Sequence, residues 1–394
     1  MSIASVQWNY PTSIWFGSGR LGDLPKACGE LGIKRPLLVT DEGLAGLPMV
    51  DRARQLLSGT GGTTELYSAV QGNPTGGQVD AGVEHFRRAQ CDGVVALGGG
   101  SALDAGKAIA LLAGQTRPLW DFEDSGDNWL RADAAGIAPV IAIPTTAGTG
   151  SEVGRASVIL DESQARKVII FHPKMLPALV ISDPELTVGL PPSITAWTGI
   201  DAFVHALEAY LAPGFHPMAD GIAVEAMRLV QRYLPRAVAD GNDLEARGQM
   251  LAAASMGATA FQKGLGSIHA LSHVVGALFN THHGLTNAIV LPYGVYLNAP
   301  AIEDRLTYLC KALALPGNST GAFIDFLQQF CSDLDIPADL AALGLDGGRA
   351  GEIGALALED PSAAGNARAL DADQYTALYR AALAGDFSLL DGVR

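Results

Sequence analysis

Apolar residues in the first half of the chain follow two alternating patterns. Short apolar runs that end in polar or glycine-rich turns predict buried strands, and they are RPLLVTD (35–41), DGVVALGGGS (92–101) and APVIAIPTTAGTGSE (138–152). Between them lie amphipathic stretches such as ALDAGKAIALLAG (102–114), whose apolar residues recur at helical spacing. Strands that alternate with helices predict a parallel, doubly wound, Rossmann-like sheet.

The pattern changes after LVISDPELTVGLPPS (179–193). Long helical stretches follow, among them SITAWTGIDAFVHALEAYL (193–211) and ARGQMLAAASMGATAFQKGL (246–265), with few strand candidates. We place the domain boundary near residue 188, at the Gly-Leu-Pro-Pro turn signal. The sequence therefore predicts an α/β domain over residues 1–188 and an all-helical domain over residues 189–394.

Composition narrows the class of protein. The chain is 48% hydrophobic and 17% charged, with a formal net charge of −15 and no run rich in Lys or Arg, so we expect neither nucleic acid nor a membrane as a partner. The spacing of the four cysteines fits neither a zinc knuckle nor a disulfide framework. The first residues lack the pattern of a signal peptide, and we expect a cytoplasmic protein with buried thiols.

Two glycine-rich loops and one aspartate follow the predicted strands. The loop Gly98–Ser101 would let the backbone and a helix N-terminus approach a diphosphate, although a structural turn needs the same glycines. The loop Pro144–Ser151 offers hydroxyls and amides at the next strand. Asp41 would accept hydrogen bonds from a ribose diol and repel a 2′-phosphate, which favours NAD over NADP. Its alternative role is a helix N-cap before EGLAGLP.

Histidine is concentrated in one stretch of the chain. Four of the eight histidines lie in SIHALSHVVGALFNTHHG (267–284). His269 and His273 are four residues apart on a helical pattern, as are Asp201 and His205, so each pair projects from one helix face. A single histidine among apolar residues is usually a core residue, but several buried imidazoles with an aspartate each need a partner.

One shared metal ion explains this clustering. His283 follows just before Gly284, where we expect the chain to turn. One carboxylate and three imidazoles suit Fe(II) or Zn(II) and contain too much nitrogen for magnesium or calcium. The candidate ligands are Asp201, His205, His269 and His283.

The chain resembles the iron-containing (group III) alcohol dehydrogenase family over essentially its full length. The resemblance rests on GGGSALDAGKAIA, PTTAGTGSEV, SDPELTVGLPPSITAWTGIDAFVHALEAY and HALSHVVGALFNTHHG. It implies the dehydroquinate synthase-like fold of that family, with NAD and Fe(II), or else Zn(II), as cofactors. The family's metal ligands fall on the four residues named above. Its NAD-contacting positions fall on Asp41, Asn73, Gly99, Gly100, Ser101, Thr145, Thr146, Thr149 and Lys167.

Two histidines of the stretch 267–284 remain outside this ligand set. The family commonly has proline before its last ligand, where this chain has His282. The separation of 14 residues from His269 favours His283 as the ligand, with His282 as a surface residue or a neighbour of the ligands. His273 matches a position beside the nicotinamide, where it would relay the released proton or only shape the pocket.

The resemblance implies reversible hydride transfer from a small primary alcohol or hydroxy acid. GRASVIL and FQKGLGSIHALSH are similar to the branch that oxidises 4-hydroxybutyrate, with Arg155 or Lys263 as partner of the substrate carboxylate. Candidate apolar walls of the pocket are Phe203, Phe261 and Phe279.

Several alternatives remain open at this point. They are a lyase of the dehydroquinate synthase type, polyol oxidation like that of glycerol dehydrogenase, a metal-dependent hydrolase and a non-catalytic metal-binding protein. The lyase would need a basic cluster near the metal, which the sequence around the candidate ligands lacks. The segment SVQWNYPTSIWFG (5–17) predicts an edge strand that could pair between protomers, so we expect a homodimer.

Overall fold

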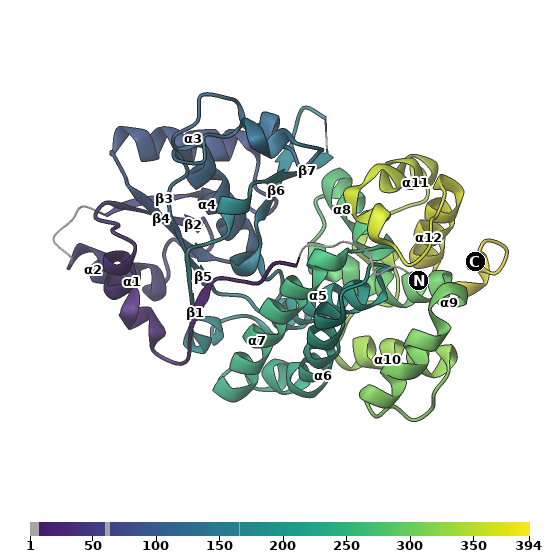
Figure 1. Cartoon of the computed structure of the whole chain (residues 1–394). Coiled ribbons are helices and arrows are strands. Elements are labelled where there is room, and N and C mark those ends of the chain that lie inside the picture. Colours follow the sequence, from purple (N-terminus) through teal and green to yellow (C-terminus); the bar gives the residue numbers. More distant parts are fainter. Residues whose placement is uncertain (1–7, 60–63, 165) are drawn as a thin grey trace. The chain divides into compact units, whose positions relative to one another are not determined.

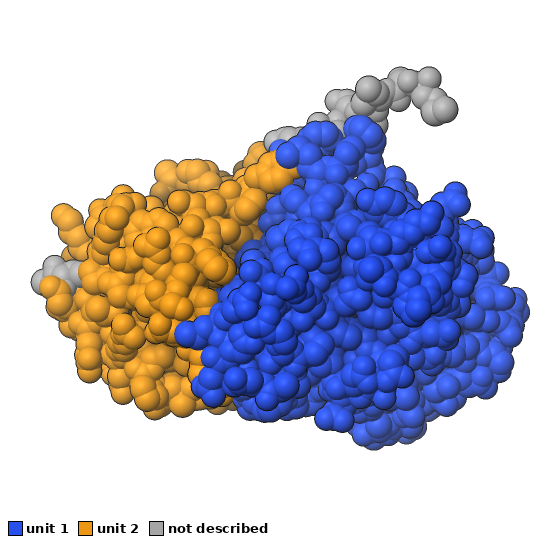
Figure 2. Space-filling model, turned by 90° about the horizontal axis from the view of Figure 1, so that it is seen from below, with its two compact units in different colours: residues 1–9, 190–394 blue, residues 10–189 orange. Residues whose placement is uncertain are grey.

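The computed structural model describes residues 8–59, 64–164 and 166–394. The chain divides into two compact units, coloured separately in Figure 2. Unit 1 contains residues 1–9 and 190–394, and unit 2 contains residues 10–189. Of the described helices, none combines the length and apolar character that crossing a membrane requires.

Unit 2 is built on a six-stranded parallel sheet with the strand order β1-β8-β5-β4-β2-β3. Figure 1 labels β1, β2, β3, β4 and β5 of this sheet. Three of the strands predicted from the sequence are β2, β4 and β5, which are neighbours in the sheet. This sheet confirms the predicted α/β class. Its strands are β1 (Ser13–Phe16), β2 (Pro36–Asp41), β3 (Glu65–Val70), β4 (Gly93–Gly98), β5 (Val140–Pro144) and β8 (Leu179–Ser182).

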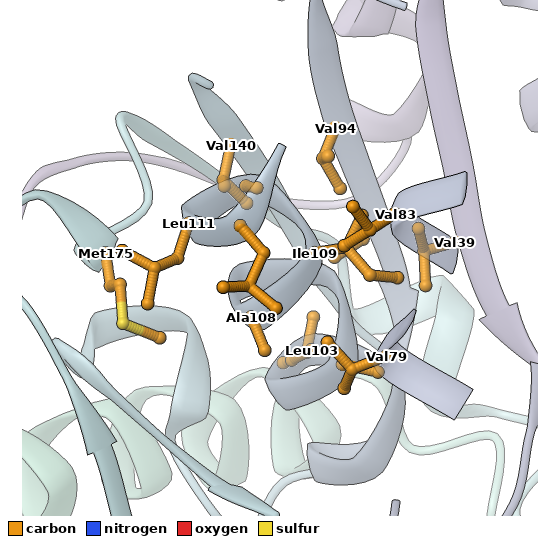
Figure 3. Packing of buried hydrophobic residues seen from close by; sticks show 14 of the residues in the cluster. Val39, Val79, Val83, Val94, Leu103, Ala108, Ile109, Leu111, Val140 and Met175 are labelled. Carbon is orange, nitrogen blue, oxygen red and sulfur yellow. The ribbon is translucent and has the colours of Figure 1, made fainter. Parts of the chain in front are cut away.

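Helices cover both faces of this sheet because its strands are apolar on both sides. Val94 belongs to the core that includes residues of α3 and α4, shown in Figure 3, whereas Val95 belongs to the core that includes residues of α1 and α2. Successive residues of a strand point to opposite faces, so one strand supplies both cores. The helices are α1 (Leu24–Glu30), α2 (Pro48–Ser58), α3 (Gly76–Arg88) and α4 (Gly100–Leu112), with 3-10 turns η1 (Arg20–Asp23), η2 (Leu119–Phe122), η3 (Asn128–Arg131), η4 (Ser151–Val153), η5 (Pro173–Met175) and η6 (Pro184–Thr187).

Unit 2 also contains a separate antiparallel hairpin, which was not predicted from the sequence. Its strands are β6 (Ala156–Asp161) and β7 (Arg166–Phe171). The N–H of Leu160 donates to the carbonyl of Pro74 at 2.8 Å, which ties the hairpin to the loop after β3.

The predicted edge strand is β1, which has β8 as its one neighbour in the sheet. Residues 5–7 of the predicted segment lie outside the described residues. The edge carries Phe16, whose side chain is among the exposed large apolar groups.

The described residues of unit 1 form helices joined by loops and no strand, as predicted for the second domain. The long helix α5 contacts α6, α7 and α9 and is buried on nearly all sides, which matches its even distribution of apolar residues. The helices are α5 (Pro192–Leu211), α6 (Pro217–Ala239), α7 (Leu244–Ala260), α8 (Ser267–Phe279), α9 (His283–Ala312), α10 (Thr320–Asp333), α11 (Ala350–Glu359) and α12 (Ala372–Ala384), with 3-10 turns η7 (Phe261–Lys263), η8 (Leu340–Leu343), η9 (Pro361–Gly365) and η10 (Phe387–Leu390).

Candidate functional site

The predicted dinucleotide loops lie side by side at the carboxyl edge of the sheet in unit 2. Strand β4 lies between β2 and β5. Gly98 at the end of β4 is the register partner of Pro144 at the end of β5. The N–H of Thr145 donates to the carbonyl of Gly98 at 3.0 Å, which joins the two loops where the strands end. This is the edge at which parallel α/β sheets bind their ligands.

Glycine is required where these loops touch. Gly98 has a φ of +152°, and a Cβ on Gly100 would lie 2.6 Å from Cγ2 of Thr149. Gly99 is the N-cap of α4 and supplies no side-chain hydrogen bond to the helix. The first N–H groups of α4 therefore have no side-chain cap and can face an anion.

Asp41 ends β2 next to this glycine loop. Its Oδ1 accepts the N–H of Leu44 at 3.0 Å, and its Oδ2 lies 3.2 Å from where a Cβ on Gly98 would be. Burial raises the pKa of the Asp41 carboxyl, although nearby backbone N–H groups oppose the shift. The alternative role as a helix N-cap is wrong, because Asp41 caps a turn and the N-cap of α2 is Leu47.

The remaining predicted cofactor residues come from the loop after β3 and from the hairpin. Asn73 has a left-handed φ of 55° in the loop before α3. Lys167 is the register partner of Leu160, and Leu160 is bonded to Pro74 in the same loop. All nine predicted cofactor positions therefore belong to unit 2.

The four predicted metal ligands come together in unit 1. Asp201 and His205 project from α5, His269 from α8 and His283 from the start of α9. One nitrogen or carboxylate oxygen from each lies within 4.8 Å of all the others. The helical spacing of four residues places the first two on one face of α5, and the packing of three helices supplies the rest.

The distances within this group fit a small cation. Oδ1 of Asp201 lies 3.9 Å from Nε2 of His205, 3.8 Å from Nε2 of His269 and 3.7 Å from Nε2 of His283. Ligands about 2.1 Å from one ion at tetrahedral angles are about 3.4 Å apart. The four ligand atoms, all within 4.8 Å of one another, would therefore move closer together around one ion.

The chain turns before His283, not after it as the sequence analysis expected. Asn280 ends α8 in the left-handed region, and His282 is the exposed N-cap of α9, accepting the N–H of Leu285. Gly284 lies inside α9, where a Cβ would be 2.5 Å from the carbonyl oxygen of Trp197. The glycine thus allows α9 to approach α5 closely enough for His283 to face the other ligands.

Two buried residues that sequence reasoning missed contact the ligands. Oε2 of Glu208 lies 2.6 Å from Nδ1 of His269. Nδ2 of Asn287 lies 2.8 Å from Oδ1 of Asp201, with Nε2 of His269 and of His283 at 3.2 and 3.1 Å. Both had a signal in the sequence, because Glu208 is three residues after His205 and Asn287 is four after His283.

His273 lies beside the ligands and is held from a distant segment. Its ring stacks on that of His283 with centroids 5.3 Å apart. Nδ1 of His273 lies 3.0 Å from Oδ2 of Asp360, whose other oxygen accepts the N–H of Ser362 at the start of η9. Asp360 is 87 residues away in sequence, and no local pattern indicated this contact.

Negative charge is concentrated around these histidines. Among the described residues, the ion pairs of Asp201, Glu208 and Asp360 are all with histidines, and the three side chains are 3%, 5% and 9% exposed. Burial lowers the pKa of His269, but Glu208, Asp201 and Asp360 outweigh it and raise that pKa. A dication would fit this donor set in charge as well as in geometry.

Two sequence-based expectations about the substrate pocket are wrong. Lys263 pairs with Asp220 and donates to the carbonyl of Tyr210 at 3.0 Å, and its side chain is 1% exposed. An enclosed, paired ammonium of this kind does not serve a substrate carboxylate. Phe203 is fully buried and packs on Phe326 and Phe330, so it is a core residue and not a wall of the pocket. The ring centroids of Phe261 and His205 lie 5.2 Å apart.

Comparisons with known proteins agree over both units. Residues 11–184 match the iron-containing alcohol dehydrogenase model, and residues 195–383 match the C-terminal model of the Fe-containing alcohol dehydrogenase family. The chain is 39% identical to 4-hydroxybutyrate dehydrogenase of Cupriavidus necator, covering 85% of this chain and 89% of that protein.

Solved structures show the same fold. A 1,3-propanediol oxidoreductase has a TM-score of 0.90 and 32% identity, covering 96% of this chain and 100% of that one. A sulfoacetaldehyde reductase of Bifidobacterium kashiwanohense, solved with NAD+, has a TM-score of 0.86 and 29% identity, covering 97% and 100%.

Proposed function

Since the chain belongs to the iron-containing alcohol dehydrogenase family, its reaction is the NAD-dependent oxidation of an alcohol, and we propose that four residues of unit 1 hold the metal ion of that reaction. Membership confirms the resemblance noted in the sequence. The observation that carries the proposal is the mutual approach of one ligand atom from each residue to within 4.8 Å. This donor set suits Fe(II) or Zn(II), and membership of the family favours Fe(II). The residues are Asp201, His205, His269 and His283.

For the dinucleotide, the carboxyl edge of the sheet in unit 2 is the proposed site. The first N–H groups of α4 and the hydroxyls of the loop after β5 would bind the diphosphate. Asp41 would accept hydrogen bonds from the ribose diol and would disfavour a 2′-phosphate, so NAD is preferred over NADP. The positions involved are Asp41, Asn73, Gly99, Gly100, Ser101, Thr145, Thr146, Thr149 and Lys167.

The chain's own part in the chemistry is to orient the reactants and to move a proton. When bound, the ion would draw electron density from the substrate oxygen and make the hydroxyl proton easier to remove. Asp360 can only accept at Nδ1 of His273, which leaves Nε2 of that ring as the acceptor for a proton. His273 is therefore the proposed proton relay, with a role limited to shaping the nicotinamide pocket as the alternative.

The proposed substrate is a short hydroxy acid such as 4-hydroxybutyrate. Support comes from the 39% identity with a 4-hydroxybutyrate dehydrogenase. Arg155 is the remaining candidate for the substrate carboxylate, since Lys263 is enclosed with Asp220. Lyase chemistry of the dehydroquinate synthase type and glycerol dehydrogenase-like polyol oxidation are disfavoured, because both halves of the chain match alcohol dehydrogenase models.

Two further parts of the proposal concern assembly and location. The exposed edge of β1 supports a homodimer formed by pairing of this strand between protomers. The cytoplasm is the proposed location, and it follows from the family and from the buried free thiols.

Elemental analysis joined to a substrate panel tests this function. Wild-type protein prepared with iron or zinc should retain the ion and reduce NAD faster with 4-hydroxybutyrate than with butanol or 1,2-propanediol. His269→Ala should lose both the ion and the activity, and undiminished turnover would contradict the metal role. Arg155→Gln should raise KM for 4-hydroxybutyrate and leave KM for butanol unchanged; equal effects on both would remove the reason to invoke Arg155.

A further inference from the structure

Glu208 is enclosed behind one of the proposed metal ligands. It lies on α5, one turn beyond His205, and 5% of the residue is exposed. Its Oε2 lies 2.6 Å from Nδ1 of His269, and its Oε1 accepts the N–H of Ile268 at 2.8 Å. A Cβ on Gly266 would lie 2.8 Å from Oε1, so the absence of a side chain there makes room for the carboxylate.

The carboxylate of Glu208 is stabilised by hydrogen-bond donors of the protein more than by water. A cavity of about 10 Å³ lies beside it, lined by Glu208, Gly266, Ser267, Asn298 and Asn366 among others. That volume holds one water molecule at most, and the charge is therefore stabilised mainly by the two N–H groups that face it.

The contact with Glu208 indicates one tautomer of His269, and the position of Asn287 is compatible with it. An ionised carboxylate only accepts, so Nδ1 of His269 must carry the proton that it donates to Glu208. On the other side of the ring, Nδ2 of Asn287 lies 3.2 Å from Nε2, which fits an acceptor at Nε2, although the two hydrogens of this amide are shared among Asp201, His269 and His283. The amide orientation of Asn287 is fixed by its 2.8 Å hydrogen bond to Asp201, since only its nitrogen can donate there.

From this geometry we infer that Glu208 is a positioning residue of the metal centre: it keeps the proton of His269 on Nδ1 and so directs the Nε2 lone pair to the ion before the ion arrives. The inference rests on the proposed metal site and adds to it a residue that does not bind the ion. Carboxylates placed in this way behind a histidine ligand fix its ring and raise its basicity.

The variant Glu208→Gln separates this role from simple space filling. The amide of the variant side chain has one acceptor oxygen, whereas two N–H groups, of Ile268 and of His269 Nδ1, face this position. The backbone N–H of Ile268 can only donate. The oxygen is therefore expected to accept from Ile268, and the amide NH2 then faces Nδ1 of His269. That nitrogen would become an acceptor, and the proton would move to Nε2, where it blocks binding of the ion.

The first measurement is the tautomer of His269 in metal-free protein, by NMR of chains with ¹⁵N-labelled histidine. The signal is assigned by its absence from His269→Asn. We expect the Nδ1–H form in the wild type and a shift toward Nε2–H in Glu208→Gln. An Nε2–H form in the wild type would overturn the inference, whether or not the variant folds.

The second measurement is the dissociation constant for Zn(II), from competition with a chelator. We expect Glu208→Gln to bind about 10- to 100-fold more weakly. The matched control is Asp183→Asn in unit 2, another buried carboxylate, which accepts the N–H groups of Gly19, Leu21 and Glu185. Equal affinities of Glu208→Gln and wild type would overturn the inference alone, whereas a wild type that binds no Zn(II) would overturn the proposed metal site itself.

Discussion

The two candidate sites are built from different parts of the chain. In unit 2 the dinucleotide edge consists largely of main chain, with glycines where β4 meets α4 and where the loops touch. In unit 1 the metal centre consists of side chains that project from α5, α8 and α9. A main-chain site is damaged when a side chain is added, whereas a side-chain site is damaged when one is removed.

The composition of each site follows from the architecture of the unit that contains it. Parallel strands bring their carboxyl ends to one edge, so backbone groups from several loops converge without long side chains. Packed helices bury their backbones, so only side chains at the right helical spacing can meet between them. The comparison therefore predicts opposite responses of the two units to mutation.

Removal of a metal ligand should have the largest effect. Asp201→Ala deletes the carboxylate oxygen that faces all three imidazoles, and the stabilisation of transition-state charge lost with the ion is worth several kcal/mol. We expect no retained metal and a kcat/KM reduced about a thousandfold or more. NADH binding, measured by fluorescence, should change less than about twofold if each of the two sites forms without the other. A variant that also loses NADH binding would break the comparison.

Addition of a methyl group at the glycine loop should have the next largest effect. Gly100→Ala would place its Cβ 2.6 Å from Cγ2 of Thr149 and push the two loops apart. Overpacking of this kind costs about 1–3 kcal/mol, so we expect the Kd of NAD to rise about tenfold by calorimetry. Metal content should not change. The control is Gly22→Ala, where a Cβ meets nothing within 4 Å; an equal loss of affinity there would show that the loop contact is irrelevant.

Much of this organisation was predictable because it is local. Apolar runs that end in polar or glycine-rich turns predicted β2, β4 and β5. A spacing of four residues predicted that Asp201 and His205 share one face of α5 and that His269 and His273 share one face of α8. The hairpin β6–β7 was missed although its two strands are adjacent in sequence. Asp360 was not predicted, because its partner His273 lies 87 residues away in sequence and packing alone brings the two together. Lys263 was misjudged for a related reason, since its burial with Asp220 depends on how α6 and η7 meet.

Substitution of Asp41, the side chain proposed to select NAD over NADP, should have a smaller effect. Asp41→Asn keeps an acceptor for the N–H of Leu44 and removes the negative charge. We expect the preference for NAD over NADP in kcat/KM to fall about tenfold, because a 2′-phosphate no longer meets a carboxylate. Glu42→Gln, one residue further on, should leave the preference unchanged. A preference that survives in Asp41→Asn would mean that main chain alone selects the cofactor.

The smallest effect concerns the buried thiols, which report on each unit separately. Burial raises the pKa of Cys28 and Cys91 in unit 2 to about 11 and that of Cys331 in unit 1 to about 12. The thiolate fraction at pH 8 is therefore about a hundredfold or more below that of an ordinary cysteine, and alkylation by iodoacetamide should be slow. Removal of the metal by a chelator should speed alkylation of Cys331 and not of Cys28 or Cys91. Equal acceleration in both units would contradict an effect confined to unit 1.

The enclosed carboxylates of unit 1 also link the lifetime of the protein to its ion supply. Asp201, Glu208 and Asp360 are enclosed beside the histidines, and a dication bound there would balance part of their negative charge. An ion at a hundred times its Kd adds about 2.7 kcal/mol to the free energy of unfolding, a sizeable share of the roughly 5–15 kcal/mol typical of a domain. Starvation for the metal would thus expose more chains to proteolysis, and a cell would lose the protein together with its activity.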